Sequence, residues 1–126
     1  MKKYFVDTNF FLRFILKDNL RQWRIADNYF QEARSEKIRL VFLTEIILEI
    51  EYVIRKVYKL NRKIIFKYLS TLLAINSIEI PDREVLRKAL LVYLEKNIDL
   101  IDVILFLKAK SQESTVLSFD RDLKRL

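Results

Sequence analysis

Short apolar runs alternate with longer stretches of helical periodicity along this chain, and that order limits the fold more than any other feature. Four short apolar runs have the length and residue types of β-strands: residues 2–7, 38–43, 77–81 and 114–119. Apolar residues recur at helical spacing over residues 8–17, 20–37, 45–58, 61–75, 83–97 and 99–113, and a short terminal helix is expected over 120–126. Strands that alternate with helices or helix pairs predict an α/β sandwich with a mainly parallel sheet.

Boundary residues support this division of the chain. Thr8 or Asn9 is expected to cap the first helix, and Thr44, Asn61 and Asp82 are expected to cap later ones. The first strand is apolar on both faces, which is typical of an inner strand of a parallel sheet.

Glycine, histidine and cysteine are all absent from the 126 residues. Without glycine there is no P-loop and no dinucleotide-binding turn, because both need a close backbone approach. Without histidine or cysteine there is no Ser-His-Asp triad, and a structural zinc site has no plausible ligands. An enzyme of this composition must therefore use carboxylates, alone or by holding a hard metal ion. Turns must rely on other polar residues, such as Asn19, Asn61, Asn76 and Asn97.

The composition indicates one soluble globular domain over residues 1–126. Apolar residues make up 52% of the chain and charged residues 33%. The longest stretch without a charge, residues 68–78, is far shorter than the roughly 20 residues of a membrane span, and Asp7 interrupts any signal-peptide core. We therefore expect a cytoplasmic protein that does not associate with a membrane. The net charge of +7 modestly favours a nucleic-acid partner, with a generic basic surface as the common alternative.

Two aspartates directly follow apolar strands. Asp7 ends the first expected strand, and Asp120 follows the run "TVLSF". Ligands of open parallel α/β sheets bind at the carboxyl ends of strands. Taken alone, however, Asp7 is better explained as a helix cap, and the neighbours Arg121, Asp122 and Lys124 look like ordinary surface charges.

The helix expected over residues 45–58 carries two glutamates with different surroundings. Its central core stripe is predicted to comprise Ile46, Ile50, Val53 and Val57. Glu49 falls at the edge of that stripe, where a carboxylate needs a partner. Glu51 falls on the far side and is expected to be a solvated charge.

Asp102 stands on an apolar face, with Leu105, Phe106 and Ala109 at the following helical positions. Backbone N–H groups near a helix start could satisfy it, and functional burial explains it equally well. Asp99 shares that side of the helix and could be its cap.

Taken together, two strand ends and two helix faces can converge at one edge of a parallel sheet. Clustered carboxylates cannot all stay ionised without a cation. Oxygen-only ligands suit Mg²⁺ or Mn²⁺, and such sites hydrolyse phosphodiesters by activating water. A basic surface around an acidic metal site suits a nucleic-acid substrate.

Four segments carry a resemblance to a known family: "YFVDTNFFLRFIL", "LTEIILEIEYVIRKVYKL", "NIDLIDVILFLKA" and "TVLSFDRDLKRL". In that order they resemble PIN domains, specifically VapC-type toxin ribonucleases, over nearly the whole chain. The resemblance implies a three-layer α/β/α sandwich with a mainly parallel central sheet of four to five strands. It also implies a Mg²⁺- or Mn²⁺-dependent endoribonuclease that cleaves single-stranded or looped RNA.

The same resemblance assigns roles to individual residues. The four metal-binding, catalytic acids fall on Asp7, Glu49, Asp102 and Asp120. Glu45 competes for the second role, but the spacing to "YVIRKVYK" favours Glu49. The positions that hydrogen-bond the acids or the metal-bound water fall on Thr8, Asn9 and Ser118, and a common accessory acid falls on Asp99.

Partners are also implied. VapC-type proteins are toxins that pair with an antitoxin, which would block the acidic pocket with an inserted Arg or Lys, and they form homodimers. Leu48 and Tyr52 lie off the predicted core stripe and could pack on a partner. Lysine and arginine clusters at 55–67 and 121–125 are candidates for RNA binding.

Two other functions remain open at this point. One is a catalytically silent PIN-like domain that binds RNA or acts as a scaffold, although the presence of all four acids argues against it. The other is a phosphatase with Asp7 as its nucleophile. That chemistry wants a second acid two residues later, where this chain has Asn9, which cannot transfer the proton.

Overall fold

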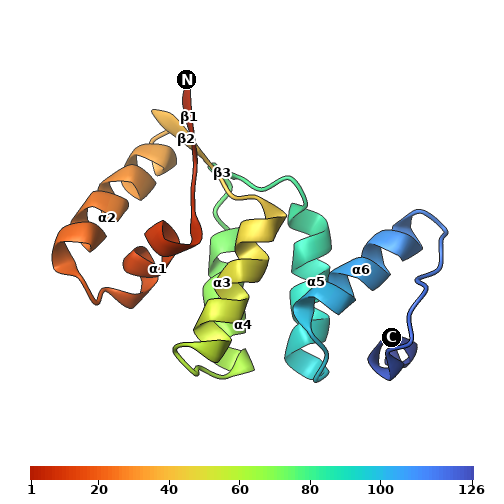
Figure 1. The fold of residues 1–126 in the computed structure, drawn as a ribbon. Helices are drawn as coiled ribbons and strands as arrows, with labels where there is room; N and C mark the ends of the chain where they lie inside the picture. Colours follow the sequence, from red (N-terminus) through yellow and green to blue (C-terminus); the bar gives the residue numbers. More distant parts are fainter.

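The computed structural model describes all 126 residues (Figure 1). In chain order the elements are β1 (Lys2–Phe5), α1 (Thr8–Leu16), α2 (Leu20–Arg34), β2 (Ile38–Val41), α3 (Thr44–Lys56), α4 (Arg62–Leu73), β3 (Ile78–Glu79), α5 (Arg83–Glu95), α6 (Leu100–Ser111) and the 3₁₀ helix η1 (Arg121–Arg125). The alternation of strands with helix pairs is the order that the sequence predicts.

The strands form one parallel sheet with the order β1-β2-β3. Tyr4 lies opposite Leu40, and Leu40 lies opposite Ile78. One further backbone hydrogen bond prolongs the β1–β2 pairing, from the Val6 N–H to the Val41 carbonyl at 3.0 Å. The prediction of an α/β fold with a parallel sheet is therefore confirmed, while the three-layer arrangement stays a prediction.

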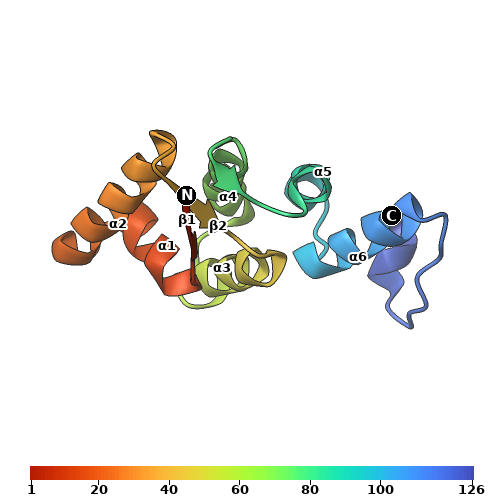
Figure 2. The same ribbon diagram turned by 90° about the horizontal axis from the view of Figure 1, so that it is seen from above.

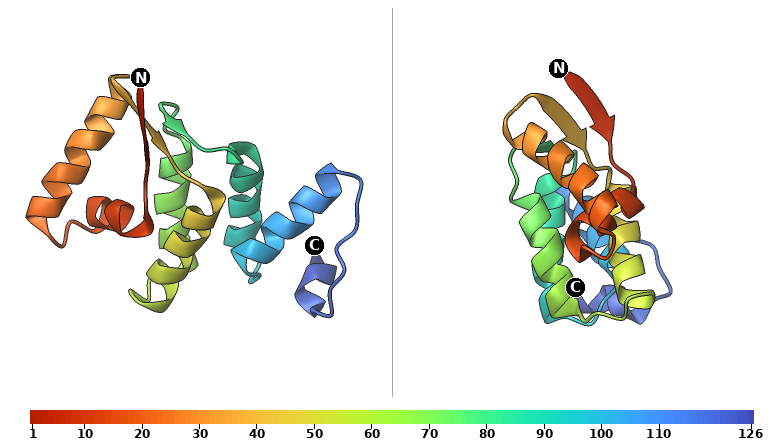
Figure 3. Two further views of the ribbon diagram at one scale, coloured as in Figure 1. Left: turned by 45° about the horizontal axis from the view of Figure 1, so that its top comes forward. Right: turned by 90° about the vertical axis from the view of Figure 1, so that its left-hand side faces the viewer.

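The sheet has three strands, so the expectation of four to five is wrong. Residues 114–119, the expected fourth strand, form an irregular segment that pairs with no strand. In consequence β1 is an edge strand, not the inner strand that its apolar residues predict, and Phe5 remains 68% exposed. The buried central strand is β2, and β1 lies outermost in the sheet (Figure 3).

Side chains cap the starts of α1, α2 and α4, whereas α3, α5 and α6 begin without a side-chain cap. Asp7 caps α1, which confirms its interpretation as a helix cap, and Thr8 and Asn9 do not cap it. Asn61 caps α4 as predicted, and its side chain accepts a hydrogen bond from the Ile64 N–H at 3.0 Å. Asp82 precedes α5 but gives no side-chain cap, because its carboxylate is bound elsewhere. Thr44 is the first residue of α3 and does not cap it.

Four turns place a non-glycine residue in the left-handed region, at Lys17, Glu36, Lys59 and Glu113, with φ between 52° and 60°. The asparagines that the sequence analysis named for turns are not at these positions. Asn19 and Asn61 cap helices instead. A residue with a Cβ costs roughly 1 kcal/mol in this conformation, which a chain without glycine has to accept at each such turn.

A single hydrophobic core joins the sheet to the helices. Near β2 it is aromatic: the ring of Phe30 stacks on Phe14 with centroids 4.1 Å apart, and Phe11 meets Phe42 edge-on at 5.5 Å. No helix combines the length and apolar character needed to cross a membrane.

The helices succeed one another across the molecule (Figures 1 and 2). The pair α1 and α2 lies on one side of β1, and α3 to α6 follow on the other. Helix α6 packs chiefly on α5. The C-terminal segment lies beyond α6, at the opposite end of the molecule from α2, which places it far from the edge of β1.

Candidate active site

Asp7 lies at the carboxyl end of β1, where the chain turns into α1. Its Oδ1 accepts a hydrogen bond from the Phe10 N–H at 2.8 Å, so the carboxylate caps the helix. The side chain is exposed, and Oδ2 makes no hydrogen bond within the protein. The neighbouring hydroxyl of Thr8 is buried and has no hydrogen-bond partner. Asp7 therefore caps α1 through Oδ1, and Oδ2 is available to bind a ligand.

A hollow of about 220 Å³ opens beside Asp7 and is lined by Asp7, Asn9, Phe10, Arg13, Gln22 and Ile25. Arg13 is the cation of this hollow. One of its terminal nitrogens donates to the Tyr58 hydroxyl at 2.8 Å, and the other lies 3.3 Å from the carboxylate of Asp18. Sequence reasoning did not single out Arg13, although it is the only charge in the apolar helix "TNFFLRFIL".

Glu49 lies on the exposed surface of α3. The buried residues of this helix are Ile47, Ile50, Glu51 and Ile54, which differ from the predicted stripe of Ile46, Ile50, Val53 and Val57. Val57 is 66% exposed. The core-facing stripe of α3 is thus rotated toward Glu51. The prediction that Glu49 borders the core is wrong, because Glu49 is exposed.

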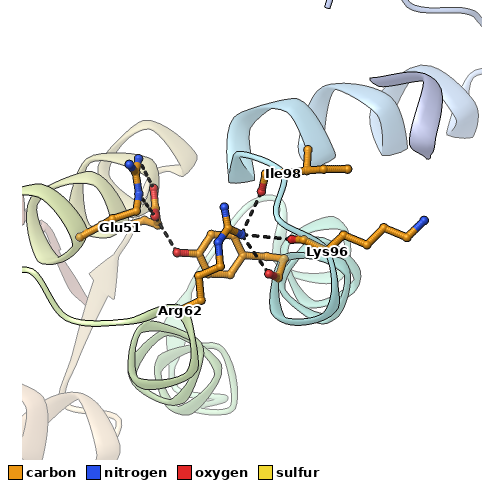
Figure 4. Close-up of polar contacts among 6 residues, drawn as sticks. Glu51, Arg62, Lys96 and Ile98 are labelled. Atoms are coloured by element: carbon orange, nitrogen blue, oxygen red, sulfur yellow. Dashed lines mark hydrogen bonds and ion pairs between the residues drawn. The ribbon is translucent and has the colours of Figure 1, made fainter. Parts of the chain in front are cut away.

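Glu51 is buried, with only 4% of its surface exposed, so its predicted role as a solvated charge is wrong. Arg55 binds it through Nε to Oε2 at 2.7 Å, and the Tyr93 hydroxyl donates to the same oxygen at 2.7 Å (Figure 4). These partners repay the desolvation of the carboxylate. Burial, the hydrogen bond to Glu51 and its negative charge raise the pKa of Tyr93 well above its ordinary value.

Arg62 supports the same network from α4. Its Nη1 donates to the carbonyls of Tyr93, Lys96 and Ile98, and its guanidinium lies 4.1 Å from the centre of the Tyr93 ring (Figure 4). These carbonyls belong to the end of α5 and the turn that leads to α6. Arg62 therefore fixes where α6 begins.

Asp102 stands in the first turn of α6, near three other acids. Burial raises the pKa of Asp102, and the negative charges of Asp120, Asp99 and Asp122 raise it further. Asp120 caps η1 by accepting from the Asp122 N–H at 2.9 Å, and its own N–H donates to the Ser118 hydroxyl at 2.9 Å. This end of α6 is thus a region where negative charges repel one another and where a cation would be stabilised.

The face of α6 that carries Asp102 is not the core face. The buried residues of the helix are Leu100, Val103 and Ile104, while Leu105 and Ile101 are exposed. Helix α6 is therefore apolar on more than one side, and Ile101 and Leu105 lie on a side that stays exposed.

Asp82 forms a polar junction that the sequence analysis did not predict. Its Oδ2 accepts hydrogen bonds from the Thr44 hydroxyl at 2.7 Å and from Lys108 Nζ at 2.9 Å. These two hydrogen bonds, that of Thr44 foremost, lower the pKa of Asp82. The junction links α3, α5 and α6 and explains why Asp82 does not cap its own helix.

The four predicted acids are only partly brought together in one chain. Asp102 and Asp120 share a region with Asp99, whereas Asp7 lies at the sheet and is not among the charges that act on Asp102. No group of three or more acidic side chains is placed to hold a metal ion. The oxygen donors suit a hard divalent cation by type, but their positions in a single copy do not assemble a site for one.

Parallel strands, crossover helices and an aspartate at a strand end define a helix-rich α/β protein. The family profile of the PIN domain matches residues 4–126, and the chain belongs to the PIN domain family. PIN domains are commonly nucleases, and such nucleases typically use divalent metals. Comparisons with curated proteins and with solved structures gave no match.

Proposed function

We propose that this protein is a metal-dependent endoribonuclease that hydrolyses RNA phosphodiester bonds, and that it acts as the VapC-type toxin of a toxin–antitoxin pair. The observation that carries the proposal is the PIN domain match over residues 4–126. That range includes all four candidate acids, Asp7, Glu49, Asp102 and Asp120, so none of the expected ligands has been replaced.

The positions of these four carboxylates in a single copy do not form a metal site. Brought together, they would hold Mg²⁺ or Mn²⁺, and the ion would supply an activated water and offset charge on the scissile phosphate. Two features of the chain support this role. Asp7 keeps one oxygen free, and the buried hydroxyl of Thr8 beside it lacks a partner. The pKa of Asp102 is raised by burial and by neighbouring acids, a situation that a bound cation relieves.

The accessory residues act on the acids and not on the substrate in this proposal. Ser118 accepts a hydrogen bond from the backbone of Asp120 and thereby orients the turn that carries that acid. Asp99 adds negative charge beside Asp102. Thr8 and Asn9 directly follow Asp7, and Asn9 lines the hollow of about 220 Å³ beside Asp7.

Part of the basic segment at 55–67 is free to bind an RNA backbone. Arg55 and Arg62 are engaged by Glu51 and by backbone carbonyls. The lysines of the segment are exposed to solvent: Lys56, Lys59, Lys63 and Lys67. We propose that these lysines bind phosphates, so RNA affinity should fall with increasing salt concentration. Arg121 and Lys124, exposed on η1, would add to it.

As a toxin, the protein would be held inactive in the cytoplasm by an antitoxin that places an Arg or Lys side chain among the acids. The excess of negative charge around Asp102 is the feature of this chain that favours such an insertion.

The test is cleavage of a panel of single-stranded and looped RNAs by the purified protein in Mg²⁺, Mn²⁺ or EDTA. Wild type is compared with Asp7→Asn, Asp102→Asn and the control Glu32→Gln, which alters an exposed acid of α2 that forms no ion pair. We expect metal-dependent cleavage that both aspartate variants lose and the control keeps. Cleavage in EDTA, or full activity of both aspartate variants, would refute the proposal.

A further inference from the structure

The outer edge of β1 is free and apolar. The strand pairs with β2 on one side only. Phe5 is exposed there, and a hollow of about 460 Å³ beside the edge is lined by Tyr4, Phe5, Val6, Asp7, Phe10, Ile25, Tyr29 and Leu40. Lys2 and Lys3 discourage pairing at the start of the strand, but no charge, proline or bulge blocks its carboxyl half. This edge is a ready template for another strand.

A segment of matching character lies unpaired in the same chain. Residues 114–119 have the composition of a strand, yet the backbone of Thr115–Phe119 makes no hydrogen bond within the protein. Leu117 is 97% exposed and Phe119 is fully exposed. The segment and the outer edge of β1 are complementary, because both are apolar and both carry backbone N–H and C=O groups without a partner strand.

The segment cannot reach the edge of its own β1 in this arrangement. It leaves α6 on the side away from the sheet and lies at the far end of the molecule (Figures 1 and 2). Its far end is held there as well, because Lys96 Nζ donates to the carbonyl of Arg125 at 2.8 Å. Helix α6, from which the segment leaves, makes its main contact with α5 and not with the sheet.

We propose that the occupant of this edge is a second copy of the chain: residues 114–119 of each subunit pair with β1 of the other. The exchange is reciprocal about a two-fold axis, so it closes as a dimer and leaves no unpaired copy. The added strand runs parallel to β1, as β2 and β3 already do. The sheet of each subunit then gains its fourth strand from its partner.

The register follows from the two strand ends. When Val6 lies opposite Phe119 of the partner subunit, the apolar residues of both strands cover one another, and Asp120 of the partner subunit stands beside Asp7. The exchange thus joins acids that a single copy keeps apart. This part of the inference rests on the proposed function, because it assigns each nuclease site to residues of two chains.

Two further features fit an exchanged dimer. Ile101 and Leu105 leave a second apolar face of α6 uncovered, and the partner would lie against it. The turn between α6 and the segment is made by Glu113 with φ of 54°, a left-handed conformation that a glutamate adopts at a cost. Opening this turn into the exchanged path would release that cost and would break the hydrogen bond from Lys96 Nζ to the Arg125 carbonyl.

The absence of cysteine allows a direct test by disulfide formation. The proposed register places Phe5 opposite Ser118 of the partner subunit. A chain with Phe5→Cys is co-expressed with a chain carrying Ser118→Cys, and we expect a disulfide-linked heterodimer on oxidation. The matched control pairs Phe5→Cys with Thr115→Cys, three residues away, and should cross-link far less. A Phe5→Cys/Ser118→Cys chain that forms its disulfide internally and stays a monomer would overturn the proposal.

The oligomeric state gives the second readout, by light scattering after size exclusion. Wild type should have twice the 15.3 kDa mass of one chain, and Leu117→Ser/Phe119→Ser should have the mass of one. Both replaced side chains are exposed in a single copy, so the variant should keep its helical circular dichroism. Leu91→Ser, at an exposed leucine of α5, is the control and should stay dimeric. A monomeric wild type, or a variant that remains dimeric, would overturn the proposal.

Complementation separates this inference from the proposed function. When Asp7→Asn and Asp120→Asn chains are co-expressed, half of the randomly formed dimers have one intact exchanged site, so about a quarter of wild-type activity should return. Sites contained within one chain would give none. If the cross-link and the mass support exchange while wild type cleaves no RNA, the nuclease proposal fails and the exchanged dimer stands.

Discussion

Replacing Tyr93 with phenylalanine should destabilise the protein through a single missing hydroxyl. Tyr93 is fully buried, and its hydroxyl donates to Glu51 Oε2 at 2.7 Å. Phenylalanine keeps the ring and its packing but leaves the buried carboxylate with Arg55 as its only partner. The variant therefore isolates one charge-assisted hydrogen bond in the core.

The size of the effect follows from the geometry. A hydrogen bond to a charged group contributes roughly 1.5–3 kcal/mol, and Glu51 has no water to replace it because only 4% of its surface is exposed. For a chain of 126 residues, each kcal/mol lowers the midpoint of thermal unfolding by about 3–4 °C. We expect Tyr93→Phe to lower the free energy of unfolding by roughly 1.5–3 kcal/mol and the midpoint by about 5–12 °C.

Urea unfolding followed by circular dichroism measures this change. The matched control is Tyr52→Phe, which removes the hydroxyl of a 55% exposed tyrosine on the same helix as Glu51 and should change stability by less than about 0.5 kcal/mol. Adding Glu51→Gln to both backgrounds gives a double-mutant cycle, in which Tyr93 and Glu51 should couple by about 1 kcal/mol or more.

The effect should also depend on pH. The pKa of Tyr93 is raised in the folded state, chiefly by burial, above its unfolded value of about 10. Its stabilising contribution is therefore complete below about pH 10 and declines as the pH rises further. The stability difference between wild type and Tyr93→Phe should shrink above pH 10. Equal stability of the two proteins at pH 7, or a coupling near zero, would refute this account of the network.

Two further predictions concern a turn and an acid. Lys59→Gly should stabilise the protein by up to about 1 kcal/mol, because glycine adopts its φ of 56° without steric cost, while Lys63→Gly within α4 should destabilise it by a similar amount; chemical denaturation compares them. Hydrogen bonds from Thr44 and Lys108 lower the pKa of Asp82, so its contribution is present above the unfolded pKa of about 3.9 and is lost as pH falls. The free energy of unfolding, measured between pH 2 and 7, should therefore be higher for wild type than for Asp82→Asn near pH 7. The difference should disappear near pH 2.

Local pattern was enough to predict the identity and order of nearly all elements. The residues of β1, β2 and β3 and of the six α-helices lie within the ranges that apolar periodicity indicates, apart from Thr44 at the start of α3. The predicted cap at Asn61 shows why: a helix start depends on a side chain only three residues from the N–H that it binds. The left-handed turns at lysine and glutamate were missed, because no local signal marks such residues for positive φ.

The choice of the buried stripe on α3 could not be made locally. The helix carries apolar residues on several sides, and the predicted stripe and the observed one share Ile50. Which side faces inward depends on α5, where Tyr93, 42 residues from Glu51, supplies the hydrogen bond that allows a carboxylate in the core. A pattern read along one helix contains no information about such a partner.

The candidate site shows the same division. The identity of the acids, Asp7, Glu49, Asp102 and Asp120, and the absence of histidine and cysteine restrict the chemistry to oxygen ligands through residue type alone. Whether the four side chains meet depends on contacts between distant segments. For Asp120 and Asp7 it depends on the position of residues 114–119 relative to β1.

By itself, therefore, the sequence determined the kinds of elements, their order, the parallel α/β class and an oxygen-only set of candidate ligands. Only the tertiary structure decided that β1 is an edge, that Glu51 is buried against Arg55 and Tyr93, and that Asp120 lies with Asp102 and away from Asp7. The physical reason is one of range. Helix and strand formation depend on neighbours a few residues apart, whereas edges, buried charges and converging acids depend on contacts between distant segments.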